Sequence, residues 1–214
     1  MGSCNSGGKG GGEGWGGGGG GAIDILNTDS LISARERQRL EVDETLQTFK
    51  DMNDEYGYRV DDLQIATLGA KDANTMAYYD GANIAFNETY FNKRVMESAY
   101  ARCVQDGYHP SQGNKTALQA VASHEIGHAL TDRAIARMGT VKGDSAEAII
   151  REAQKAVGHK GKLADMASKI SGYAKESARE CIAEAVSDVY CNGKKAHKES
   201  QAIVNVMNKY LKNK

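Results

Sequence analysis

The chain has 214 residues, and its 27 lysines and arginines nearly balance 28 aspartates and glutamates, for a formal net charge of −1. This balance gives no electrostatic reason to expect a nucleic-acid partner, because domains that bind nucleic acid carry a marked positive excess. No apolar run approaches the roughly eighteen residues of a membrane span, and the N-terminal residues do not form a classical secretory signal peptide. The four cysteines include no CxxC pair, which favours reduced thiols. We therefore expect a cytoplasmic protein.

Residues 1–21 contain 13 of the 25 glycines and almost nothing apolar except Trp15. Such a segment cannot bury enough surface to offset the conformational entropy lost on ordering, so we expect a disordered tail. Its start, Met-Gly-Ser-Cys-Asn-Ser, fits the pattern for N-myristoylation of Gly2, although we favour the simpler interpretation of a start built from small residues. Residues 22–55 are predicted as an N-terminal helical segment and 56–214 as one folded domain.

The predicted organisation is α+β, with a small sheet containing a hairpin before a mostly helical half. In chain order, periodicity and turn residues predict a helix over 28–53, a strand over 59–68, a hairpin over 76–86, and helices over 87–104, 115–138, 144–157, 161–171, 176–191 and 196–212.

The hairpin is predicted from its turn, because Asp80-Gly81 stands between two short apolar segments and is typical of a type I′ turn. Its second strand, residues 82–86, is expected at the edge of the sheet, where an extended peptide can add as a further strand. Asn87 is then predicted to cap the following helix.

The most informative motif is His124-Glu125-Ile126-Gly127-His128, within the predicted helix over 115–138. Positions i and i+4 share one face of a helix, so both histidines can bind one metal ion. Glu125 can then take a proton from a metal-bound water, as in zinc peptidases. Apolar neighbours place the motif in a half-buried helix, where two unpaired histidines would be costly. Gly127 costs ~1 kcal/mol relative to alanine, which predicts that another backbone passes close by or that the cleft needs room.

A catalytic zinc ion usually has three protein ligands and a water, so a third ligand is needed. Glu180, Glu184 and Asp188 are spaced four apart on the predicted helix over 176–191 and form one acidic stripe. The stripe has apolar flanks and no lysine at i+4, which favours buried acids facing a cation over a solvated acidic face. Spacing alone leaves open which acid is the ligand.

The remaining histidines carry less information. His109 lies in the loop before the motif helix and could line a cleft, but a histidine in a loop is usually solvated. His159 and His197 stand among lysines without a partner at a metal-binding spacing, and both are predicted at the surface.

Three segments resemble the zincin-like catalytic domain of the anthrax lethal factor family: residues 124–130, 171–173 and 180–185. The chain is also similar to zincin-like domains of phage minor head and polyvalent proteins, through residues 107–110 and 188–193. The resemblance covers roughly residues 56–210. It implies that residues 56–214 form a zincin-like metallopeptidase domain.

The resemblance also implies roles for individual residues. His124, His128 and Glu180 would be the ligands of a Zn²⁺ ion, and Glu125 would be the general base. Tyr173 stands seven residues before Glu180, which is the family spacing, and would donate a hydrogen bond to the oxyanion of the reaction.

The position of Glu184 distinguishes two possible registers of the acidic stripe. In the lethal-factor register Glu184 lies behind the metal and orients a ligand histidine. In a thermolysin-like register Glu184 is the ligand and Asp188 is the acid behind it. The spacing from Tyr173 favours Glu180 as the ligand.

These assignments predict a zinc-dependent endopeptidase that acts on a peptide or protein substrate. The phage resemblance adds an alternative, which is a virion component or accessory phage protein whose zincin domain is inactive or has a single maturation target. Such a protein would reside in the phage virion and contact virion proteins. A third hypothesis is a metal-free helical domain in which the HExxH pattern is accidental.

Overall fold

The computed structural model describes residues 24–25, 39–57, 63–69, 72–139 and 145–212. The predictions for the glycine-rich tail, for Gly2 and for the first part of the helix over 28–53 lie outside these residues. Within the described residues, no helix combines the length and the apolar composition needed to cross a membrane.

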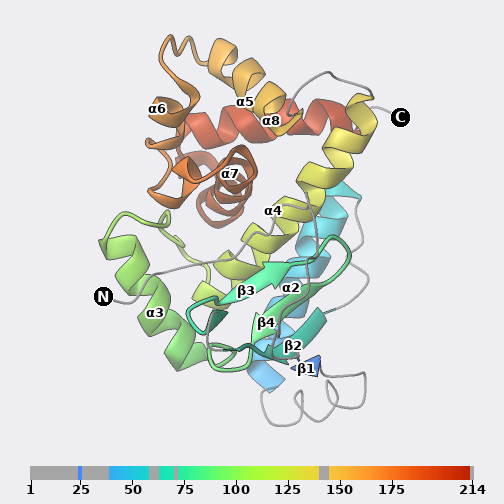
Figure 1. The fold of residues 1–214 in the computed structure, drawn as a ribbon, viewed down its shortest axis with the longest axis vertical. Coiled ribbons are helices and arrows are strands. Elements are labelled where there is room, and N and C mark those ends of the chain that lie inside the picture. The colour runs from blue at the N-terminus through green and yellow to red at the C-terminus, as the bar shows by residue number, and fades with distance from the viewer. Residues whose placement is uncertain (1–23, 26–38, 58–62, 70–71, 140–144, 213–214) are drawn as a thin grey trace.

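The architecture is α+β, with a small mixed sheet and a larger number of helices, as predicted at this coarse level. In Figure 1, helix α4 crosses the middle of the molecule, between the sheet and the group formed by α5, α6, α7 and α8. The elements are β1 (Asp24–Ile25), α2 (Arg39–Tyr56), β2 (Leu63–Thr67), β3 (Ala77–Tyr79), β4 (Ile84–Asn87), α3 (Lys93–Gln105), α4 (Ala117–Met138), α5 (Ser145–Ala156), α6 (Leu163–Ala167), η2 (Tyr173–Lys175), α7 (Ala178–Asn192), η3 (Gly193–Lys195) and α8 (Lys198–Lys212).

The order of the strands shows that the prediction of residues 82–86 as an edge strand was wrong. The strands of the sheet lie in the order β1-β2-β4-β3, with β4 parallel to β2 and antiparallel to β3. The second hairpin strand, predicted at the edge, is therefore internal, because β2 pairs with it along its whole length. The edge strand beside α4 is β3 instead, and it packs against that helix.

The hairpin itself is present, but its turn is centred one residue later than predicted. Tyr79 pairs with Ile84, which places Gly81 and Ala82 at the tip, with φ +104° at Gly81. The carboxylate of Asp80 accepts the backbone N–H groups of Ala82 and Asn83. Asp80 therefore precedes the two central residues of the turn and stabilises it by accepting backbone N–H groups, as in an Asx turn.

The helix after the hairpin also begins later than predicted. The N-cap of α3 is Asn92, whose side chain accepts the N–H of Val95. Asn87, the predicted cap, ends β4 and accepts the N–H of Thr89. Asparagine accepts backbone N–H groups equally well in turns and at caps, so the sequence alone did not distinguish the two positions.

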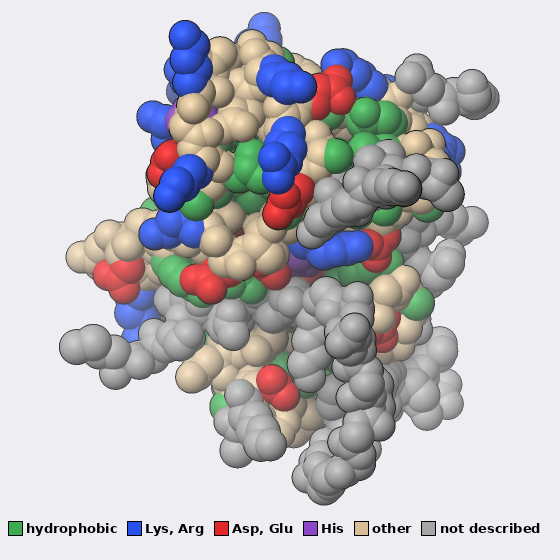
Figure 2. All heavy atoms as spheres, turned by 45° about the horizontal axis from the view of Figure 1, so that its top comes forward, with side chains coloured by type: hydrophobic (Ala, Val, Ile, Leu, Met, Phe, Trp, Pro, Cys, Tyr) green, Lys and Arg blue, Asp and Glu red, His purple; other side chains and the backbone are tan. Residues whose placement is uncertain are grey.

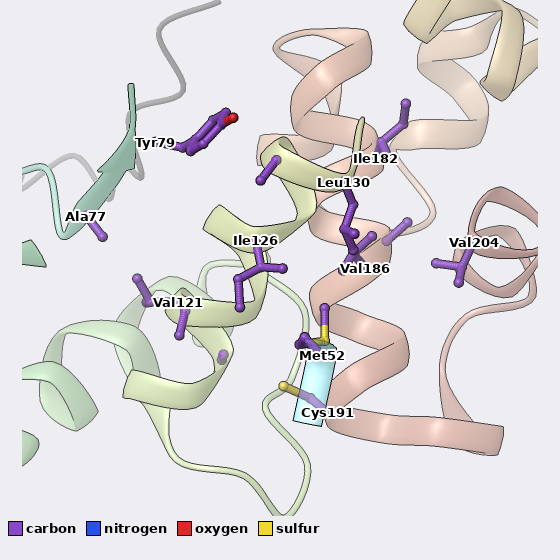
Figure 3. Packing of buried hydrophobic residues seen from close by; sticks show 14 of the residues in the cluster. Met52, Ala77, Tyr79, Val121, Ile126, Leu130, Ile182, Val186, Cys191 and Val204 are labelled. Atoms are coloured by element: carbon purple, nitrogen blue, oxygen red, sulfur yellow. The ribbon is translucent and has the colours of Figure 1, made fainter. Parts of the chain in front are cut away.

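Helix α4 is buried more completely than the half-buried helix that the sequence predicted. Every residue from Ala120 to Thr131 is buried, since β3 lies on one side and α7 on the other. Figure 3 shows Val121, Ile126 and Leu130 of α4 within this packing, with Val186 of α7 beside Leu130. The motif therefore sits in the centre of the hydrophobic core.

Two cysteines, Cys181 and Cys191, lie buried in α7 as free thiols. Burial raises the pKa of each thiol to about 12, so both are protonated and unreactive near neutral pH. Cys103 is disulfide-bonded, which corrects the prediction of reduced thiols for that residue.

A close approach of two helices explains the glycine inside the motif. A Cβ built on Gly127 would lie 2.8 Å from Cα of Ala183 and 3.2 Å from Cβ of Val186. The absence of a side chain thus brings α4 and α7 close together, as the sequence predicted. The same contact brings the histidines of α4 within reach of the acids of α7.

Gly127→Ala is expected to lower the free energy of unfolding, since the added methyl group overpacks the contact with α7 at a cost of about 1–3 kcal/mol. This loss outweighs the gain of roughly 1 kcal/mol in helix propensity. Chemical denaturation measures it, and Ala136→Gly at an exposed position of α4 reports the propensity effect alone. An unchanged or higher stability of Gly127→Ala would contradict the close packing.

Candidate metal centre

Three buried side chains from two helices meet at the predicted ligand positions. His124 and His128 come from α4, and Glu180 comes from α7. Oε2 of Glu180 lies 3.1 Å from Nε2 of His124 and 3.4 Å from Nε2 of His128. One ligand atom from each residue lies within 4.8 Å of the others, so the group could hold a metal ion.

Local capping fixes where these ligand atoms stand. Helix α4 begins with a capping box in which Thr116 and Gln119 satisfy each other's backbone N–H groups. The side chain of Ser177 caps α7 and accepts the N–H of Glu180. Glu180 therefore lies in the first turn of α7, where the helix dipole favours a negative charge.

Electrostatics couple the three residues. Although burial lowers the pKa of His124, its contacts with Glu180 and Glu184 raise that pKa well above the usual value. Burial alone would raise the pKa of Glu180, but His124 and His128 lower it to about 2. The two histidines thus favour the ionised form of Glu180, and the two acids favour the protonated form of His124.

Glu184 lies behind His124, at the position that the lethal-factor register predicts. Its Oε1 is 2.8 Å from Nδ1 of His124, and its Oε2 accepts the hydroxyl of Ser171 at 2.6 Å. Although burial raises the pKa of Glu184, His109 and His124 hold it well below the usual range. These contacts place Nδ1 of His124 against Glu184 and Nε2 of the same ring against Glu180.

Asp188, the acid behind the metal in the rival register, faces away from this group. It accepts the N–H groups of His197, from the backbone and from Nδ1, and the side-chain amide of Asn192. These bonds tie the end of α7 to the start of α8. The geometry therefore disagrees with the thermolysin-like register. His197 is exposed, as predicted, and its ring is bonded to Asp188.

The acidic stripe is not a solvated face. Glu180, Glu184 and Asp188 are exposed by only 4%, 1% and 1%. On the surface at the helical end of the molecule, Lys and Arg side chains are spread over α5 and α8 (Figure 2). The predicted burial of the acids is therefore confirmed, and Glu180 and Glu184 contact the histidine His124 of α4.

Glu125 is buried, and neither of its carboxylate oxygens has a hydrogen-bond partner among the described residues. Burial raises its pKa, while the neighbouring His124 and His128 lower it in part. A buried polar group without a partner is rare and calls for a water molecule, an ion or a functional role. Its position next to the two histidines places this carboxylate at the same centre.

Tyr173 lies against the group, as the spacing from Glu180 suggested. Its ring is stacked on His124 with a centroid distance of 5.8 Å and an angle of 26°. Its backbone N–H donates to the carbonyl of Tyr108, which fixes η2 to the loop before α4. The catalytic role of the Tyr173 hydroxyl stays a prediction.

His109 is the residue of the centre that the sequence analysis missed. It is buried, contrary to the expectation of a solvated loop histidine, and its Nδ1 lies 2.9 Å from Oε1 of Glu184. The available signal was its neighbour Pro110 and the similarity of residues 107–110 to phage proteins. Neither indicated a contact with an acid 75 positions later.

Comparison with protein-family models, with curated proteins and with solved structures found no match. The zincin resemblance therefore stays a prediction, and conclusions about function depend on the geometry of this centre.

Proposed function

We propose that the chain is a zinc-dependent endopeptidase in which His124, His128 and Glu180 hold the ion and Glu125 is the general base. One observation carries the proposal: three buried ligand groups converge beside a buried carboxylate that lacks a partner among the described residues.

Zinc suits this donor set and its spacing. Two histidine nitrogens and one glutamate oxygen form the ligand set of several catalytic zinc sites, and two ligands at about 2.1 Å from a tetrahedral ion lie about 3.4 Å apart. The separations of 3.1 Å and 3.4 Å between Glu180 and the histidines fit this value. Nδ1 of His124 lies 2.8 Å from Glu184, so Nε2 is the ring nitrogen that faces the proposed ion.

The residues of the chain divide the proposed reaction between them. When bound, zinc would polarise a peptide carbonyl and lower the pKa of the attacking water. Glu125 takes the proton from that water and delivers it to the leaving amine, and its raised pKa makes it a stronger base than an exposed glutamate. Tyr173 donates a hydrogen bond to the developing oxyanion.

The edge strand β3 is the proposed site for the substrate backbone. Among the residues that the structure describes, no strand pairs with its outer edge, and it packs on α4, which carries the motif. An extended peptide could pair with this edge by strand addition, with its carbonyl groups directed along α4. This replaces the internal strand as the expected peptide-binding edge.

The purified chain is expected to contain about one zinc ion, measured by elemental analysis after exhaustive buffer exchange. Its affinity should rise with pH, because a metal ion must displace the second proton of His124, whose pKa is raised. His128→Ala should lose the metal, and His197→Ala, at an exposed position outside the centre, should keep it. A chain that holds no metal and binds added zinc only above micromolar concentration would refute the proposal.

Hydrolysis of a mixed peptide library by the zinc-loaded chain then tests turnover. Activity should disappear with a chelator and return with added zinc. The alternative of a virion protein with one maturation target shares the metal content but would leave such a library intact.

A further inference from the structure

One carboxylate connects two histidines in this centre. Oε1 of Glu184 lies 2.8 Å from Nδ1 of His124 and 2.9 Å from Nδ1 of His109. The other oxygen, Oε2, accepts the Ser171 hydroxyl. Glu184 is thus held at both of its oxygens, by His109 and His124 at Oε1 and by Ser171 at Oε2.

The backbone around His109 is held by a second segment of the centre. The N–H of Gly172 donates to the carbonyl of Gly107 at 2.8 Å, and that of Tyr173 donates to Tyr108 at 3.0 Å. The loop before α4 is thereby paired with the segment that carries both Ser171 and Tyr173. The donors His109 and Ser171 to Glu184 therefore lie on two segments that are hydrogen-bonded to each other.

The ring of His109 is positioned by packing and by a single hydrogen bond. It is stacked on Tyr100 at a centroid distance of 5.3 Å and an angle of 5°. Its Nε2 has no hydrogen-bond partner among the described residues, and the ring lines a small cavity together with Tyr100, His124 and Glu184. The bond to Glu184 is thus the polar contact that defines which way the ring faces.

We propose that His109 is a positioning residue of the metal centre, which fixes the carboxylate of Glu184 so that its Oε1 stays against Nδ1 of His124 and Nε2 of that ring faces Glu180. The inference rests on the proposed function in one respect, namely that His124 is a metal ligand. Without the His109 donor, Oε1 of Glu184 keeps one partner, and the carboxylate can rotate away from the plane that holds the His124 ring.

Two variants of His109 separate its hydrogen bond from its packing. His109→Phe keeps an aromatic ring against Tyr100 but removes the donor. His109→Asn loses the ring but places an amide N–H close to where Nδ1 stood. Zinc affinity, measured by competition with a chromophoric chelator, should fall about tenfold in His109→Phe, as for other outer partners of metal ligands. It should stay close to the wild-type value in His109→Asn.

Cobalt provides a readout that loss of packing alone would not change. The visible absorption spectrum of the Co²⁺-loaded protein reports ligand geometry, so it should change in His109→Phe and be restored in His109→Asn. Equal affinities and spectra for wild type and His109→Phe would overturn the proposal. Equal losses in both variants would also overturn it, because they would assign the effect to the ring and not to its N–H.

A third measurement does not require a metal ion. Nitrogen-15 spectra of the imidazoles in the metal-free protein show which nitrogens of His124 and His109 carry protons. We expect a protonated, slowly exchanging Nδ1 on both rings of the wild type, and faster exchange at His124 in His109→Phe. An unprotonated Nδ1 on His109 in the wild type overturns the proposal even if His109→Phe fails to fold. A wild type that shows the expected protons but binds no zinc refutes only the proposed function.

Discussion

Glu125→Gln is expected to abolish peptide hydrolysis and to leave the zinc content of the chain unchanged. Glutamine has the same shape as glutamate, and no hydrogen bond among the described residues is lost, because the Glu125 oxygens have no partner there. The amide cannot take a proton from the attacking water, so kcat should fall by at least the 10²–10⁴-fold, as an order of magnitude, that a general base contributes. Steady-state kinetics and elemental analysis on the same preparation measure both quantities.

A matched control is available on the surface near the centre. Glu176 is an exposed glutamate four residues before Glu180, and Glu176→Gln should keep both activity and metal. If Glu125→Gln loses the metal, Glu125 is a ligand and its role is wrongly assigned. If it keeps full activity, another group is the base.

The same variant should change the stability of the metal-free chain in a pH-dependent way. Burial raises the pKa of Glu125 above the value of 4.5 that it has when exposed, so the native state binds more protons than the unfolded state. The free energy of unfolding of the wild type therefore falls as the pH rises from 4.5 through the raised pKa of Glu125 in the folded chain. Glu125→Gln lacks this titrating group. The free energy of unfolding of the variant should therefore rise relative to that of the wild type over the same pH range.

Those features of the centre that depend on helical periodicity could be predicted from the sequence. His124 and His128 are one turn apart on α4, as are Glu180 and Glu184 on α7, and such spacing places side chains on one face in any helix. Gly127 also predicted the close passage of a second backbone. Each of these inferences needed only neighbouring residues, because the helix repeat converts sequence distance into direction.

The features that the sequence did not predict depend on contacts between distant segments. His109 reaches Glu184 because the loop before α4 pairs with residues 172–173, and no local pattern encodes that pairing. The parallel pairing of β2 with β4 likewise places an internal strand where a hairpin edge was expected. Strand order is set by burial across the whole sheet, so turn residues predict the hairpin but not its neighbours.

Glu180→Ala and Glu184→Ala form the sharpest comparison, because both remove a carboxylate that contacts His124. Glu180 contacts Nε2 of His124 and also Nε2 of His128. Glu184 contacts the other nitrogen of His124, Nδ1. Glu180→Ala should therefore strip the metal, since two histidines do not complete a zinc site. Glu184→Ala should weaken zinc affinity by about 10–100-fold, as for a partner that orients a ligand.

Asp188→Ala completes the set, because it distinguishes the two registers of the acidic stripe. Its carboxylate is bonded to His197 and Asn192, away from the centre, so the variant should lose stability but keep its zinc affinity. If Glu184→Ala instead strips the metal and Asp188→Ala weakens zinc affinity, the register is thermolysin-like. In that case the carboxylate of Glu184 would have to turn away from Nδ1 of His124 and His109, and the arrangement described here would not be the metal-bound one.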